Sequence, residues 1–149
     1  MTEQTIKLEQ KINIKFKDQE LLKKSLIHKS HDNINNNEKL EFLGDRVLGL
    51  ILAKTLLKIY PEEKEGVIDK KFANLVNKKT CLLIAKKIEL RKYMTTGNSY
   101  KGLSRSDDKI IGDGLEALLG AIYLDQGIAV SEKFILTFWN EYIDKSLIT

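Results

Sequence analysis

The chain has 149 residues, 42% of them hydrophobic and 31% charged, so it can bury the core of about one domain and is not a disordered polar tail. Its 25 basic and 21 acidic residues give a net charge of +4, which permits a polyanionic partner without requiring one. Because Cys81 is the single cysteine, the sequence excludes an internal disulfide and a cysteine-based zinc finger. We expect a cytoplasmic protein with no membrane partner, since no apolar stretch approaches the length of a membrane span.

Apolar residues recur at helical spacing along most of the chain, which predicts an all-α fold of about six helices. Asp18 is a candidate N-cap for a helix over residues 18–28, and the asparagine-rich segment 31–37 is expected to be a loop. A long helix is expected from residue 37 or 38 to 60, where Pro61 ends it. Residues 62–66 would form a charged connector.

The second half of the chain is also expected to be helical. Residues 67–88 are predicted as one long helix, with an inward side made of Phe72, Leu75, Val76, Leu82, Leu83 and Ala85. The glycine- and serine-rich segment 95–109 is the clearest break. Helix resumes over residues 107–125, Gly127 is its expected C-cap, and a last helix covers residues 130–145.

Two of these helices carry acidic residues beside apolar ones. Glu38, Glu41 and Asp45 are spaced i, i+3 and i+7, so they project within roughly 60° of one another. Asp113 and Glu116 stand three residues apart at the head of an apolar run. Carboxylates that border a core are costly unless a positive charge neutralises them. All-oxygen ligands without a nearby cysteine or histidine favour Mg²⁺ or Mn²⁺ over zinc, although solvent-facing acids are the ordinary alternative.

Small residues inside both acidic segments would let two helices approach closely: Gly44, Gly112, Gly114, Ala117 and Gly120. Two acidic pairs on facing helices would suit one or two divalent ions. Such ions can activate water and stabilise the leaving oxygen in phosphodiester hydrolysis.

The two acidic segments resemble the motifs of a known enzyme family. Residues 37–48, NEKLEFLGDRVL, and 112–125, GDGLEALLGAIYLD, are similar to the two acidic motifs of the ribonuclease III catalytic domain, and His28-Lys29-Ser30 resembles the lead-in to the first. The resemblance runs from Leu8 to Tyr142. It implies the all-helical, homodimeric endonuclease-domain fold, with residues 1–149 as the catalytic domain and no double-stranded-RNA-binding domain within them.

The implied activity is Mg²⁺-dependent cleavage of double-stranded RNA to 5′-phosphate and 3′-hydroxyl ends in rRNA and mRNA processing, with Mn²⁺ able to replace Mg²⁺. By position, the resemblance assigns metal binding to four carboxylates: Glu41, Asp45, Asp113 and Glu116. Asp45 and Glu116 would be the catalytic pair. Glu38 and Glu65 match accessory acidic positions, and Phe42 matches an aromatic residue that inserts into the partner subunit.

Other features leave alternatives open. Arg46 stands where the family usually has a small residue, and it could contact phosphate or pair with a carboxylate. Lys101, Arg105 and Lys109 could contact the RNA backbone or belong to a solvated loop. The competing function is a catalytically inactive RNA-binding or scaffold relative with the same fold.

Overall fold

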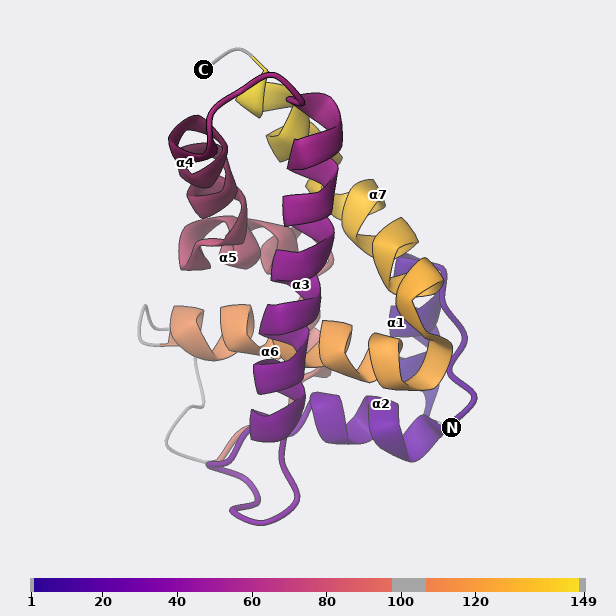
Figure 1. Cartoon of the computed structure of the whole chain (residues 1–149). Helices are drawn as coiled ribbons and strands as arrows, with labels where there is room; N and C mark the ends of the chain where they lie inside the picture. The colour runs from indigo at the N-terminus through magenta and orange to yellow at the C-terminus, as the bar shows by residue number, and fades with distance from the viewer. Residues whose placement is uncertain (1, 98–106, 148–149) are drawn as a thin grey trace.

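A computed structural model describes residues 2–97 and 107–147 (Figure 1). Over these residues the chain forms seven α-helices, one short 3-10 helix and a single isolated parallel bridge between Ile27 and Thr95. The elements are α1 (Glu3–Ile12), α2 (Gln19–Ser25), α3 (Glu38–Ile59), α4 (Glu65–Val76), α5 (Lys78–Lys87), η1 (Leu90–Tyr93), α6 (Asp107–Gln126) and α7 (Ile128–Ser146). The all-α prediction is confirmed.

The first helix, α1, was not among the helices predicted from apolar periodicity. Its N-terminus is closed by a reciprocal capping box in which the Thr5 backbone N–H donates to the Thr2 hydroxyl and the Thr2 N–H donates to the Thr5 hydroxyl. Asn13 ends the helix in the left-handed conformation at φ 57°. This added helix, and the division of residues 67–88 into two helices, bring the described residues to seven α-helices where about six were expected.

Several helix boundaries follow the predicted signals. Asp18 caps α2 by accepting hydrogen bonds from the backbone N–H groups of Glu20 at 3.0 Å and Leu21 at 3.3 Å. α3 ends at Ile59, two residues before Pro61. Gly127 separates α6 from α7 with a φ of +88°, a conformation that favours glycine.

The prediction of one helix over residues 67–88 is wrong, because Asn77 is extended with ψ 163° and divides the run into α4 and α5. The Asn77 side chain accepts a hydrogen bond from the Thr80 N–H at 2.9 Å and so begins α5. Because α5 starts in a new helical phase, Leu83 is 42% exposed and does not face inward. Glu65 and Gly66, expected in the connector, are the first two residues of α4.

The core forms where α6 passes across α3, with α4 and α5 on one side of α3 and α7 on the other (Figure 1). Leu48 and Leu52 of α3 and Leu115 and Leu118 of α6 have no exposed surface. Trp139 of α7 is likewise fully buried, and its indole N–H donates to the Leu75 carbonyl at 2.9 Å. Burial of such side chains is the dominant stabilising contribution to a helical domain of this kind.

No helix in the described part of the chain is long and apolar enough to cross a bilayer.

Candidate active site

The backbones of α3 and α6 touch where they cross, and glycines make this contact. A Cβ on Gly44 would lie 1.7 Å from the Glu116 carbonyl oxygen, and a Cβ on Gly120 would lie 2.1 Å from the Leu40 carbonyl oxygen. No side chain fits at either position. Of the small residues expected at a close approach, Gly44 and Gly120 therefore make it. By contrast, Gly114 faces the Met94 side chain, and Gly112 has only ordinary contacts.

This crossing brings the four predicted metal-binding carboxylates into one electrostatic cluster. Glu116 has its pKa raised from its ordinary value to about 9, first by burial, then by hydrogen bonding to Asp45 and by the charges of Asp45, Asp113 and Glu41. In the absence of a cation, Glu116 therefore keeps its proton at neutral pH. We refer below to Glu41, Asp45, Asp113 and Glu116 together as the acidic cluster.

Glu41 occupies the half-buried edge of the acidic cluster. Burial raises its pKa first and the charge of Asp113 raises it further, while Lys109 and Lys78 oppose the shift. Asp45 is more exposed, with 54% of its side-chain surface open. The cluster thus combines a solvent-facing carboxylate, Asp45, with the half-buried Glu41 and Glu116, whose pKa values are both raised.

One lysine already contacts the acidic cluster. The Lys109 ammonium lies 2.7 Å from the Asp113 Oδ2, one turn along α6. Lys109 was a candidate RNA contact on the sequence pattern, and the structure places it in an ion pair with a cluster carboxylate. The other two candidates, Lys101 and Arg105, lie outside the described residues.

Of the predicted accessory acids, Glu38 lies beside the acidic cluster and Glu65 does not. Glu38 is the first residue of α3, and its charge acts on both Glu41 and His28. Glu65 begins α4 beyond the C-terminal end of α3, whereas Glu41 lies in its first turn (Figure 1). At 1.5 Å per residue, roughly 27 Å of α3 separates residue 41 from residue 59.

Phe42 is 62% exposed although it is a large aromatic residue. The Arg46 guanidinium stacks 3.8 Å from the Phe42 ring centre, donates to the Phe42 carbonyl at 3.2 Å and lies 3.5 Å from the Asp45 Oδ2. Arg46 therefore pairs with a carboxylate, one of the two alternatives that the sequence left open. It also links the exposed ring to the acidic cluster.

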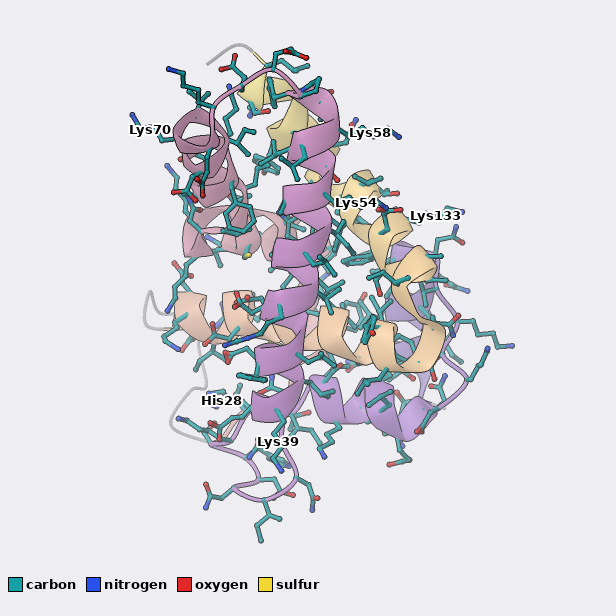
Figure 2. All side chains as sticks on the ribbon, in the orientation of Figure 1. His28, Lys39, Lys54, Lys58, Lys70 and Lys133 are labelled. Atoms are coloured by element: carbon teal, nitrogen blue, oxygen red, sulfur yellow. The ribbon has the colours of Figure 1, made fainter. Side chains whose placement is uncertain are left out.

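Two further residues, Lys78 and His28, lie near the acidic cluster, although the sequence did not predict either of them as a site residue. Lys78, the first residue of α5, is placed there by the Asn77 cap and acts on Glu41 by its charge. His28 lies at the end of the molecule where α3 begins (Figure 2), and its Nδ1 is 2.7 Å from the Ser30 hydroxyl. Burial lowers the His28 pKa, and Lys29 lowers it further, while Asp113 and Glu38 oppose this shift. The signal for Lys78 was the asparagine before it, which is a frequent helix cap.

The donor chemistry of the acidic cluster fits a hard divalent cation. Its side chains offer only oxygen atoms, the type of ligand that Mg²⁺ and Mn²⁺ take in proteins. Its excess negative charge is reduced, but not cancelled, by the proton on Glu116 and by Lys109. Among residues 2–97 and 107–147, no three or more acidic, histidine or cysteine side chains are already spaced to hold a metal ion. To hold a cation together, these carboxylates would have to move closer to one another.

We compared the sequence and the fold with those of known proteins. A sequence profile described as Ribonuclease-III-like matches residues 18–142. Ribonuclease 3 of Pelagibacter ubique is 63% identical over 97% of this chain, which spans 65% of that relative's length, so the chain covers less than two thirds of it. The nuclease domain of ribonuclease III from Campylobacter jejuni has a TM-score of 0.82 at 33% identity, covering 99% of both chains. A second structure of that nuclease domain, with a TM-score of 0.81 at 34% identity over 96% of this chain and 98% of the other, is described as flexible in a region involved in dimer formation.

Proposed function

The chain belongs to the ribonuclease III family, and from this we propose that it is the catalytic domain of a Mg²⁺-dependent endoribonuclease that cleaves double-stranded RNA. One observation carries the proposal. Four carboxylates from two crossing helices share one cluster in which Glu116 cannot ionise readily without a cation. The product ends would be 5′-phosphate and 3′-hydroxyl, and the work would be rRNA and mRNA processing in the cytoplasm, where the buried Cys81 stays a free thiol.

In this mechanism the acidic cluster holds Mg²⁺, or Mn²⁺ in its place. A bound divalent ion supplies an activated water and stabilises the charge that develops on the leaving oxygen. Asp45 and Glu116 share a hydrogen bond, and Asp45 is the more exposed of the two. Asp45 would accept a proton from the attacking water and so orient it. Glu116 would lose its proton to solvent and become a ligand, and its backbone is held at the crossing by the contact between its carbonyl and Gly44.

Double-stranded RNA fits this site better than single-stranded RNA if two copies of the chain act together. We propose a homodimer in which the exposed face of α3 meets a second copy, with Phe42 as its anchor. Leu50 and Leu57, 64% and 60% exposed, lie along the same helix. Glu65 would then act at the acidic cluster of the partner copy, because it is far from the cluster of its own chain. The two clusters would each cut one strand.

The competing hypothesis is a catalytically inactive scaffold that binds RNA. A scaffold has no physical need to bury like charges together, because an unneutralised cluster costs free energy of folding. The intact cluster of Glu41, Asp45, Asp113 and Glu116 therefore favours the enzyme.

The decisive experiment incubates the purified protein with a long duplex RNA in Mg²⁺ or in Ca²⁺ and analyses the product ends. We expect cleavage in Mg²⁺ and a loss of at least about 100-fold in rate for Asp45→Asn and Glu116→Gln. Asp69→Asn, an exposed carboxylate on α4, is the matched control and should cleave at the wild-type rate. Cleavage by Asp45→Asn within a few-fold of wild type would overturn the mechanism. A wild-type protein that does not cleave the duplex in Mg²⁺ would favour the scaffold.

A further inference from the structure

The ion pair between Lys109 and Asp113 is poorly supported by its own helix. Lys109 is the third residue of α6, where the positive end of the helix dipole disfavours a cation. The order of the pair, lysine four residues before the acid, is the less favourable one on a helix. The side chains also differ in exposure, 66% for Lys109 and 18% for Asp113. An external attraction must therefore hold the lysine here.

The acidic cluster supplies that attraction. Lys109 is coupled electrostatically to Glu41 and Glu116 as well as to Asp113. Its ammonium lies within hydrogen-bond distance of one Asp113 oxygen, so it uses an electron pair that a metal ion would otherwise accept. It also adds a positive charge that repels any second cation from the cluster.

We propose that Lys109 is a resident counter-ion of the acidic cluster, which a divalent cation must displace before it can use Asp113 fully. The inference rests on the proposed function of the four carboxylates. Displacement is feasible because the Lys109 side chain is mostly exposed, so its ammonium can turn into solvent while the more buried Asp113 stays in place. Lys109 thereby stabilises the cation-free protein and weakens its affinity for divalent metal.

The test measures metal affinity directly. Free Mn²⁺ is followed by electron paramagnetic resonance during titration of the protein, and Mg²⁺ is then added as a competitor. We expect Lys109→Met to bind Mn²⁺ about 2- to 5-fold more tightly than wild type, the upper part of the range that corresponds to losing one exposed ion pair. Lys109→Arg, which keeps the charge, should stay within about twofold of wild type.

The matched control is Lys87→Met. Lys87 forms an ion pair of similar length, 2.9 Å, with Glu141 of α7, and no carboxylate of the acidic cluster acts on it. This variant loses the same charge and one ion pair, but it should leave Mn²⁺ affinity unchanged. If Lys109→Met does not fold by circular dichroism, Lys109→Gln replaces it, with the same expectation.

Thermal unfolding provides a second readout that needs no RNA. In a chelator, Lys109→Met should unfold at a lower temperature than wild type, and saturating Mg²⁺ should remove the difference. Lys87→Met should be destabilised equally under both conditions.

The outcomes separate the two proposals. If wild type binds Mn²⁺ and Lys109→Met binds it equally or more weakly, the counter-ion inference is wrong while the proposed metal site stands. If wild type binds no Mn²⁺, both the metal site and the inference are wrong.

Discussion

Gly44 of α3 lies against the backbone of Glu116 in α6, so closely that a Cβ on Gly44 would be 1.7 Å from the Glu116 carbonyl oxygen. Gly44 precedes Asp45 in the sequence. The separation of the backbones that carry the two proposed catalytic carboxylates is therefore set by a contact between two main chains.

Gly44→Ala should destabilise the protein by at least about 1–3 kcal/mol, because the added methyl group cannot fit and the helices must separate. Urea unfolding measures the change. Gly66→Ala is the control, since a Cβ at this exposed position of α4 meets no atom within 4 Å. There the substitution should be neutral or stabilise by up to about 1 kcal/mol. Equal effects at both positions would contradict the crossing contact.

Glu116→Gln should stabilise the metal-free protein at neutral pH by about 1 kcal/mol or more, because glutamine is neutral without taking up a proton, whereas Glu116 must hold one against its ordinary pKa. The same change should abolish the rise in melting temperature that Mg²⁺ causes in wild type. Differential scanning calorimetry with chelator and with Mg²⁺ tests both statements. A variant that is less stable in chelator would show that the Glu116 carboxyl stabilises the metal-free fold, contrary to this prediction.

Phe42→Ala should weaken the proposed dimer by about 2 kcal/mol or more, roughly 30-fold in dissociation constant, as expected for a buried aromatic anchor. Sedimentation equilibrium measures this change. Ile34→Ala serves as the comparison because Ile34 is 85% exposed and lies in the loop before α3. A wild-type protein that sediments as a monomer would remove the premise.

Acid should weaken the contact that Glu89, the residue before η1, makes with Lys11 of α1. Its carboxylate accepts hydrogen bonds from Lys11 and Lys92, which lower its pKa from the ordinary 4.5 to about 2. Because the folded-state pKa is the lower one, this stabilisation is complete above about pH 4.5 and is lost as the pH falls toward 2. Unfolding free energies from pH 2 to 7 should therefore converge for wild type and Glu89→Gln at the acid end and differ above pH 5. Parallel curves would contradict the assignment.

Asn77→Ala should cost about 1 kcal/mol, because the side chain accepts the Thr80 N–H at the start of α5. Asn74→Ala, an exposed position inside α4, should be neutral or slightly stabilising. Urea unfolding of both variants separates a cap from an ordinary asparagine. Since Asn77 also sets the position of Lys78, its loss should change Mg²⁺ affinity as well.

The sequence predicts the helices that bear the acidic cluster because strong signals bound them. Pro61 and Gly127 act through their own backbone geometry, and Asp18 through a short-range hydrogen bond, so none of them needs tertiary information. Asn77 is different. An asparagine inside an apolar periodic run reads as helix, and only its extended conformation reveals the cap.

The candidate site is predictable in its residue types but not in its electrostatics. Spacing places Asp113 and Glu116 on one side of a helix, yet it does not tell which of the four carboxylates is most buried. Burial of Glu116 and the contact of Lys109 with Asp113 depend on how closely α3 and α6 approach. The i, i+4 spacing of Lys109 and Asp113 is visible in the sequence, and it was the available signal for that pair.

Trp139 gives this protein a built-in optical reporter. It is the chain's single tryptophan, it is fully buried, and its indole N–H is bound to the Leu75 carbonyl. Its emission should therefore shift to the red when α7 separates from α4. Because Trp139 is in α7 and not in either helix that carries the acidic cluster, its fluorescence can follow unfolding separately from metal binding, without any added dye or label.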